Sequence, residues 1–292
     1  MPGLIKNRVG RGYPLSMHGR ILFMSLAALT GMLWGLSGTV NAGGEPHVYL
    51  YTEEYPPMNF TRNGKPAGLA VDIVQEVARR IHASVSIAVV PWARGFRLAQ
   101  LQTNTGLFST MRTEQRERIF KWVGPLTTTT SSFYALSKRK LSLKTLDDAR
   151  KARAITVPLD WASYQTLLSA GFKNLEPVND PKLMIKLLKS GRVDYMVTDQ
   201  QNLPALLKAE GADAGLVTEM LPFMRNSTYI AFSRDTADEI VSTWQNALDQ
   251  IKLDGAFKAI YKKWLPNDKP PGLMQEPDLS PLQEMTAESR PR

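Results

Sequence analysis

The feature that most constrains the fold is an alternation of short strand-like segments with amphipathic helical segments. The strand-like segments carry apolar residues at every second position, and the helical ones carry them at spacings of three and four. In the first part of the chain, strands are expected at 47–52, 83–90 and 106–110, with helices at 72–81 and 92–102. This order predicts an α/β protein with a mainly parallel sheet.

The same alternation restarts after Asp147 and Asp148, which predicts a second α/β unit. Strands are expected at 154–157, 174–178 and 193–197, and helices at 163–170, 182–190 and 203–210. Two further strand-like segments, Ser131–Ser137 and Thr228–Ser233, bracket this unit and are predicted to connect two lobes. Lobe 1 then comprises residues 43–130 and 234–265, and residues 131–233 hold the hinge strands and lobe 2.

The two ends of the chain have compositions unlike the rest. Four basic residues precede an apolar stretch of 18 residues at 21–38, and small residues end at Ala42, which predicts a signal peptide over 1–42 and a periplasmic protein. The alternative is an uncleaved membrane anchor, because 18 residues lie at the lower edge of a spanning helix. Residues 266–292 are rich in Pro, Asp, Glu and Ser and are predicted to be a mostly disordered tail.

Charge and cysteine content exclude several classes of function. Removal of residues 1–42 leaves about 250 residues, enough for one large or two modest domains, and lowers the formal net charge from +9 to about +5. No basic block interleaved with aromatic residues is present, so no nucleic-acid partner is expected. The chain has no cysteine, which excludes disulfides, thiol catalysis and Cys-ligated metals.

Four motifs in order resemble the bacterial extracellular solute-binding proteins of family 3, the amino-acid-binding proteins of ABC transporters. They read EYPPMNF-x-x-NGKPAGLAVDIVQEVARRI (54–81), RTEQRERIFKWVGPL (112–126), GRVDYMVTDQ (191–200) and DGAFKAIYKKW (254–264). The resemblance implies a two-lobe periplasmic binding protein-like (type II) fold with two crossing hinge strands. It also implies a small-molecule ligand held in the cleft, an inner-membrane ABC permease as partner and no cofactor. We expect a monomer.

The resemblance assigns the ligand's α-carboxylate to Arg116, which ends the family's T-x-x-R element at 113–116. That element precedes an aromatic-x-x-P turn, here Trp122 to Pro125. A guanidinium suits this role because its planar fork of donors meets a carboxylate at two points and stays charged in a cleft. For Arg112 and Arg118 the alternative is a solvated face.

The resemblance also implies further ligand contacts on both lobes. Ser109, Thr110 and the backbone of Met111 correspond to donors to the carboxylate, and Asp199 to the acid that binds the ligand's ammonium group. The alternative for Asp199 is an N-cap of the following helix. Tyr55 and Phe60 correspond to an aromatic wall, although Phe60 could equally pack in the core.

Two segments depart from the family pattern. QTNTGLFST replaces the usual G-x-x-D element, and VPLDWASY replaces a Gly-Thr-Thr turn of lobe 2, which places Trp161 and Ser163 at the cleft. A bulky Trp161 where small hydroxyl residues are usual argues against an ordinary amino-acid ligand. The segment PWARGF adds Trp92 near the cleft mouth, with packing on the next helix as the alternative.

Enzyme and sensor functions are the alternatives to ligand capture. After residue 42 the only histidines are His47 and His82, at the start of a strand and the end of a helix, and no P-loop, HExxH or GxSxG motif occurs. A paired-carboxylate hydrolase or dehydratase site stays open, as does a ligand-sensing module without transport. We predict a binding protein without catalytic activity, whose lobes close on the ligand.

Overall fold

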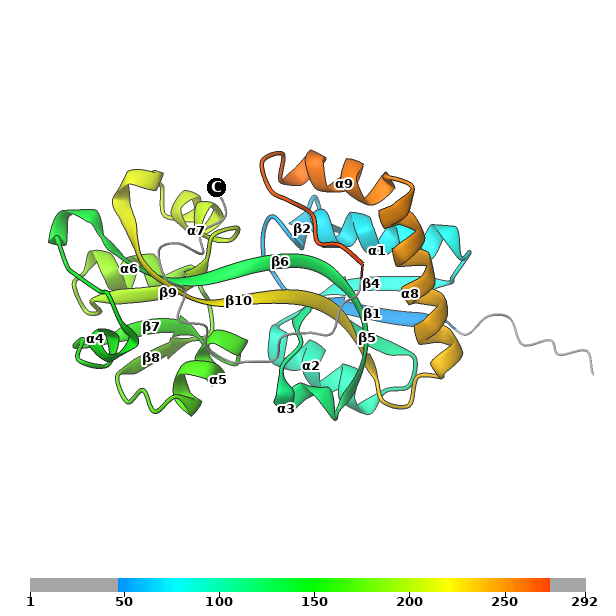
Figure 1. Ribbon diagram of the computed structural model, residues 1–292, viewed down its shortest axis with the longest axis horizontal. Helices are drawn as coiled ribbons and strands as arrows, with labels where there is room; N and C mark the ends of the chain where they lie inside the picture. Colours follow the sequence, from blue (N-terminus) through cyan, green and yellow to red (C-terminus); the bar gives the residue numbers. More distant parts are fainter. Residues whose placement is uncertain (1–46, 274–292) are drawn as a thin grey trace, which may run out of the picture. The chain divides into compact units, whose positions relative to one another are not determined.

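The structure is a computed structural model, in which residues 47–273 are described. They form an eight-stranded mixed sheet in the order β4-β1-β5-β10-β6-β9-β7-β8 and a separate hairpin, β2-β3. Figure 1 shows the elements in two groups, with β6 and β10 running side by side through both. Among these residues no helix combines the length and the apolar character that crossing a membrane requires. The predicted signal peptide lies outside the described residues.

Lobe 1 is a three-layer α/β unit, with parallel strands between helices. Its strand β1 pairs in parallel with β4 on one side and β5 on the other. The strands are β1 (Val48–Thr52), β2 (Phe60–Arg62), β3 (Lys65–Ala67), β4 (Val85–Val89) and β5 (Thr105–Met111). The helices are α1 (Leu69–Arg80), α2 (Trp92–Leu101), α3 (Glu114–Glu117), α8 (Asp238–Leu253) and α9 (Ala256–Trp264).

Lobe 2 repeats this architecture, with β7 parallel to both β8 and β9. Its strands are β7 (Ile155–Pro158), β8 (Leu175–Val178) and β9 (Tyr195–Asp199). Its helices are α4 (Leu146–Arg150), α5 (Ala162–Ser169), α6 (Leu183–Lys189) and α7 (Leu203–Ala209), with 3-10 turns η1 (Ser137–Arg139) and η2 (Ala214–Leu216).

The strands β6 (Phe120–Leu136) and β10 (Val217–Ser233) are antiparallel to each other and join the lobes. The strands cross between the lobes over the pairs from Thr128–Ser227 to Thr130–Arg225. On the lobe 1 side of these pairs β10 also pairs with β5, and on the lobe 2 side β6 also pairs with β9. The hydroxyls of Thr128 and Ser227 lie 3.1 Å apart there. The strands β1, β4 and β5 of lobe 1 and β7, β8 and β9 of lobe 2 are therefore parallel, whereas β6 and β10 are antiparallel to each other and to the strands β9 and β5 that they join.

Both crossing strands are longer than the predicted connectors. Ser131–Ser137 covers the lobe 2 half of β6, and Thr228–Ser233 covers the lobe 1 half of β10. The predicted turn at Gly124-Pro125 is wrong, because β6 continues through it. Gln245 of α8 bonds both the N–H and the C=O of Gly124, at 2.8 and 3.0 Å, which replaces strand pairing there. The ring of Tyr229 lies where a side chain at residue 124 would stand, so glycine is required.

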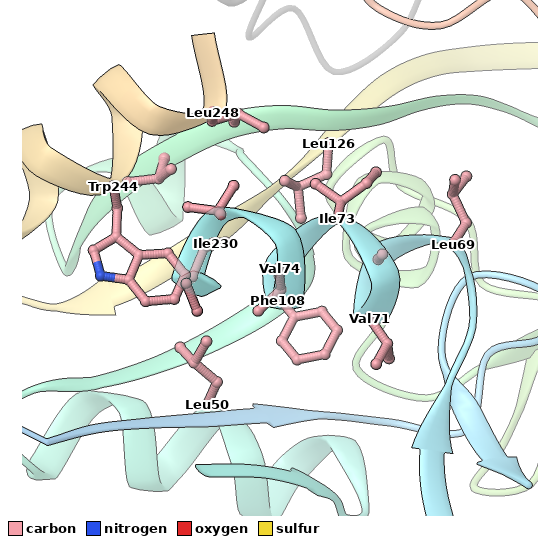
Figure 2. Packing of buried hydrophobic residues seen from close by; sticks show 14 of the residues in the cluster. Leu50, Leu69, Val71, Ile73, Val74, Phe108, Leu126, Ile230, Trp244 and Leu248 are labelled. Carbon is pink, nitrogen blue, oxygen red and sulfur yellow. The ribbon is translucent and has the colours of Figure 1, made fainter. Parts of the chain in front are cut away.

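The alternation of side chains along each strand divides each lobe's core between the two faces of its sheet. In lobe 1, Phe108 packs under α1 and α8, whereas the preceding Leu107 packs with Ala99 of α2. Figure 2 shows the first of these clusters, in which Trp244 and Leu248 of α8 meet α1 and the strands. In lobe 2, neighbouring residues of β6 likewise enter different clusters.

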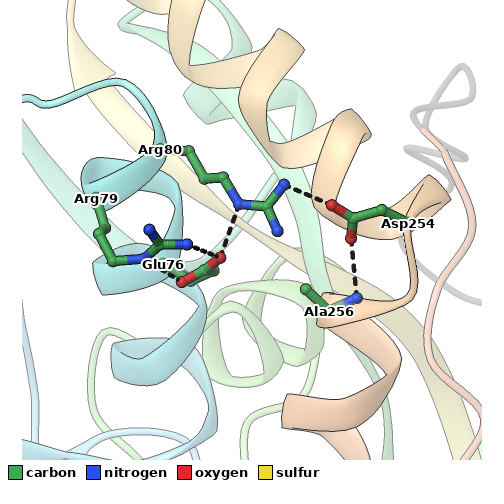
Figure 3. Close-up of polar contacts among 5 residues, drawn as sticks. All are labelled: Glu76, Arg79, Arg80, Asp254 and Ala256. Atoms are coloured by element: carbon green, nitrogen blue, oxygen red, sulfur yellow. Dashed lines mark hydrogen bonds and ion pairs between the residues drawn. The ribbon is translucent and has the colours of Figure 1, made fainter.

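A surface network ties the end of α1 to the turn between α8 and α9 (Figure 3). Glu76 accepts hydrogen bonds from Arg79 and Arg80, and Arg80 also donates to Asp254 at 2.5 Å. Hydrogen bonds from Arg79 and Arg80 lower the pKa of Glu76 to about 2. Asp254 in turn accepts from the backbone N–H of Ala256, at the start of α9.

The beginning of the predicted tail, residues 266–273, makes defined contacts. Asp268 accepts a hydrogen bond of 3.2 Å from Gln201 of lobe 2, and the carbonyl of Gly272 accepts one of 2.7 Å from Lys252 of α8. These contacts hold the segment to both lobes. The remainder of the predicted tail lies outside the described residues.

Candidate functional site

A cavity of about 30 Å³ lies where the two lobes meet, enough for a water molecule or two. Lobe 1 contributes the residues that follow β1, the end of β5, the start of α2 and helix α3, while lobe 2 contributes the start of α5. The lining residues are Glu53, Tyr55, Trp92, Ser109, Met111, Arg116, Trp161, Ala162 and Thr228. An amino acid needs more room than this volume offers.

Arg116 is the positive charge of the cavity and is only 3% exposed. Its Nη1 donates to the carbonyl of Met111 at 3.2 Å, and its Nη2 donates across the cavity to the carbonyl of Asp160, also at 3.2 Å. The guanidinium lies 5.2 Å from the ring of Trp92. Burial lowers the pKa of Arg116 to about 10, so the side chain is still cationic at neutral pH. Its Nε is buried and has no hydrogen-bond partner among the described residues.

The neighbouring arginines have other surroundings. Arg112 makes a two-point ion pair with Glu117, with both distances 2.6 Å, and its guanidinium lies 5.7 Å from the ring of Trp122. Arg118 is exposed. Among the three arginines of this segment, only Arg116 lines the cavity.

Glu53 is the acidic residue of the cavity lining, and sequence reasoning missed it. It directly follows β1, and its Oε2 accepts a hydrogen bond of 3.2 Å from Nε1 of Trp161 in lobe 2. Burial raises the pKa of Glu53 to about 8, an effect that the Trp161 hydrogen bond and Arg116 partly offset. The carboxyl is therefore mostly protonated at pH 7. The sequence could have indicated Glu53 by its position at the carboxyl end of a parallel strand, since ligands bind at such ends in α/β sheets.

Aromatic rings from both lobes meet beside these charges. Trp161 packs edge-on against Tyr55, with ring centroids 5.3 Å apart, and belongs to the margin of the lobe 1 core. Asp160, just before it, has φ of 64°, a left-handed conformation that is uncommon outside glycine. Ser109, on the other lobe, also has a positive φ of 60°, and its hydroxyl donates to the side chain of Asn59.

Six of the residues singled out from the sequence line the cavity: Tyr55, Trp92, Ser109, Met111, Arg116 and Trp161. The other four lie outside its lining. Thr110 is buried and bonds the carbonyl of Leu107, Ser163 is buried within α5, and Phe60 packs edge-on against Trp264. The last of them is Asp199.

Asp199 lies one layer behind the cavity. It is 1% exposed, and its Oδ1 accepts a hydrogen bond of 2.9 Å from the backbone N–H of Asn202, before α7. It also accepts from the hydroxyl of Tyr55. Burial raises the pKa of Asp199 above its ordinary value, whereas these hydrogen bonds act against the rise. The side chain thus contacts Tyr55 and the turn that precedes α7, and the N-cap alternative is wrong because the N-cap of α7 is Asn202.

The family described as "Bacterial extracellular solute-binding proteins, family 3" matches residues 48–267. Among similar proteins, a probable amino-acid-binding protein of Bacillus subtilis (strain 168), YxeM, is 24% identical over 260 residues. That match covers 83% of this chain and 92% of YxeM.

Solved structures of the same architecture superpose on the chain. A histidine kinase sensor domain with similarity to periplasmic binding proteins gives a TM-score of 0.70 at 20% identity, covering 78% of this chain and 99% of that one. The arginine-, lysine-, histidine-binding protein ArtJ of Geobacillus stearothermophilus gives a TM-score of 0.67 at 18% identity, covering 77% and 97%. Both likenesses support the two-lobe binding-protein fold.

Proposed function

This chain belongs to the bacterial extracellular solute-binding proteins of family 3, and we propose that it captures an amino acid or a related carboxylate between its lobes. The bound, closed form is then recognised by an inner-membrane ABC permease. The protein acts as a monomer in the periplasm, after cleavage of the signal peptide behind Ala42. Lobe 1 comprises residues 43–130 and 234–265, and residues 131–233 hold the hinge and lobe 2.

The observation that carries this proposal is the buried, unpartnered Nε of Arg116 at a cavity between two lobes. A buried N–H without a partner costs free energy that an acceptor on a ligand would recover. A carboxylate is the acceptor that best matches a guanidinium. The ring of Trp92 beside the guanidinium limits its motion, which favours a fixed pose for the anion.

Closure follows from contacts that reach across the cavity. Arg116 and Glu53 of lobe 1 bond Asp160 and Trp161 of lobe 2. A ligand that touches both lobes binds the closed state better than the open one, and so shifts the hinge equilibrium towards closure. The crossing strands β6 and β10 are the elements about which this motion takes place.

Melting of the purified protein with each of the twenty protein amino acids tests the proposal. A binding protein gives a rise in Tm that saturates with concentration, and mass spectrometry finds the added amino acid unchanged afterwards. Loss of the amino acid during incubation would instead identify an enzyme. The absence of any shift across the panel would overturn the amino-acid assignment.

A further inference from the structure

We propose that the end of lobe 2 remote from the cavity is a docking surface for anionic phospholipid, through which the protein rests on a membrane. This surface, here called the basic tip, consists of Lys138, Arg139, Lys140, Lys151, Arg153 and Lys189. The inference goes beyond the proposed function and does not depend on which molecule the cavity takes.

The sheet of lobe 2 gathers the basic tip at one edge. The strands β7 and β9 are parallel, and the carboxyl end of β7 leads to Trp161 at the cavity, so their amino ends form the opposite edge. Lys151 and Arg153 come just before β7, and Lys189 ends α6 before β9. Residues 138–140 follow β6, which is antiparallel to β9 and therefore ends at the same edge. Figure 1 shows α4, which Lys151 follows, at the end of this lobe away from lobe 1.

The positive charges of the basic tip outnumber the acids that could neutralise them. Asp194 accepts from two guanidiniums on one oxygen, with Oδ1 at 2.8 Å from Arg139 and 3.2 Å from Arg153. The second acid nearby, Asp148, is engaged in capping α4. Six basic residues against two acids leave an excess of four positive charges. In the described part of the chain, no hydrogen bond or ion pair engages the side-chain amines of Lys138, Lys140, Lys151 and Lys189.

The residue types favour a lipid surface over a protein partner. All four lysines of the basic tip are exposed, and lysine is depleted in protein–protein interfaces, where aromatic residues, Met and Arg are enriched. Clusters of about four to eight Lys and Arg residues are typical of binding to anionic headgroups. Arg139 and Arg153, held together by Asp194, add N–H donors that suit phosphodiester oxygens. Docking through this end leaves the cavity, at the other ends of the strands, facing away from the lipid.

Vesicle binding by residues 43–292, the processed form under the proposed function, tests the inference. The core clusters of both lobes begin after residue 46, so removal of 1–42 leaves them whole. Sedimentation compares vesicles of phosphatidylcholine alone with an equimolar mixture of phosphatidylcholine and phosphatidylglycerol. We expect binding to the mixed vesicles only, and its loss at about 1 M salt, where the screening length falls to about 3 Å. Equal binding to both vesicles, or binding that survives the salt, would overturn the inference.

Two triple variants with the same change in net charge locate the contact. The tip variant combines Lys138→Gln, Lys140→Gln and Lys151→Gln. The control combines Lys65→Gln, Lys258→Gln and Lys262→Gln, at exposed positions of lobe 1. The tip variant should bind the mixed vesicles about a hundredfold more weakly, whereas the control should bind close to wild type, and equal Tm values show that both are folded. A tip variant that binds no more weakly than the control would contradict the assignment.

An acidic protein surface is the competing partner. Because the chain has no cysteine, Ser142→Cys, at an exposed position two residues after Lys140, gives a single attachment point for a photo-crosslinker. On isolated inner membranes we expect adducts with phospholipid. Adducts with a membrane protein, together with failure to bind protein-free anionic vesicles, would assign the basic tip to a protein partner and overturn the lipid inference.

Discussion

Nη2 of Arg116 and the carbonyl oxygen of Asp160 lie 3.2 Å apart, and this hydrogen bond joins the two lobes. The arginine assigned to the ligand therefore also contacts the opposite wall of the cavity. A strained backbone at Asp160, with φ of 64°, presents that carbonyl. Under the proposed function, ligand binding and closure would share one side chain, and its removal should affect both.

Replacement of Arg116 tests the assigned carboxylate contact. Arg116→Ala should weaken binding of the amino acid that stabilises the wild type by about 2–5 kcal/mol, or roughly thirty to several thousandfold, because the anion loses its buried charged partner. Arg118→Ala, at an exposed position, should cost under about 1 kcal/mol. Calorimetry measures both, and melting without amino acid checks folding. Loss of binding in Arg118→Ala with normal binding in Arg116→Ala would refute the assignment.

Glu53 should make the stability of the unliganded protein depend on pH in an unusual direction. Its pKa is about 8 in the folded state against 4.5 as a reference, so the folded state holds more protons between these values. The free energy of unfolding should therefore fall as pH rises from 4.5 through 8. The difference in Tm between Glu53→Gln and wild type should therefore be more positive at pH 9 than at pH 5. The same difference at both pH values would show that Glu53 does not titrate in this window.

Trp161 tests the contact between the lobes. Trp161→Ala removes both the ring contact with Tyr55 and the hydrogen bond to Glu53, so the closed state loses stability relative to the open one. Small-angle scattering without amino acid should show a larger radius of gyration than for wild type. Trp161→Phe keeps a ring and should give an intermediate value. Identical scattering from all three proteins would mean that Trp161 does not hold the lobes together.

Two glycines near the hairpin β2-β3 provide a matched pair for stability. Gly68 has φ of 130°, and a Cβ there would stand 2.3 Å from the carbonyl oxygen of Met58, so Gly68→Ala forces the backbone to move. Gly64 has φ of 73° with nothing within 4 Å, and Gly64→Ala carries only the conformational cost. We expect about 3 kcal/mol or more for Gly68→Ala and about 1 kcal/mol for Gly64→Ala. Denaturant unfolding measures both; equal losses would contradict the steric argument.

Hydrophobic periodicity predicted most elements of the two lobes to within a few residues, because each helix and strand buries one regular face. It did not predict the length of β6, since Gly124-Pro125 has the composition of a turn. Only the tertiary contacts with Gln245 and Tyr229 make a continuous strand there. Local sequence carries no sign of a partner more than a hundred residues away.

Only part of the site was predicted from the sequence, because the missing part also depends on tertiary contacts. Arg116 stands in a motif whose residue types suit an anion, and the structure places it at the cavity. Whether an acid faces a cavity or caps a helix depends on the direction of its side chain, which sequence spacing does not fix. Asp199 points to Tyr55 and Asn202, whereas Glu53 meets Trp161 from the other lobe. These contacts exist only after the two lobes come together.

The chain path also sets an order of assembly during synthesis. Lobe 2 is one continuous segment of the chain between Leu136 and Val217, which pair with each other in the sheet. The buried residues of its core clusters come from this segment and from the adjoining halves of β6 and β10. The main lobe 1 cluster, in contrast, needs Trp244 and Leu248, which the ribosome adds after lobe 2. Because domains fold as units while the chain emerges, lobe 2 can be complete while the earlier-made half of lobe 1 still awaits α8. The half of lobe 1 that is made before lobe 2 is thus the last of the described segments to gain a finished core.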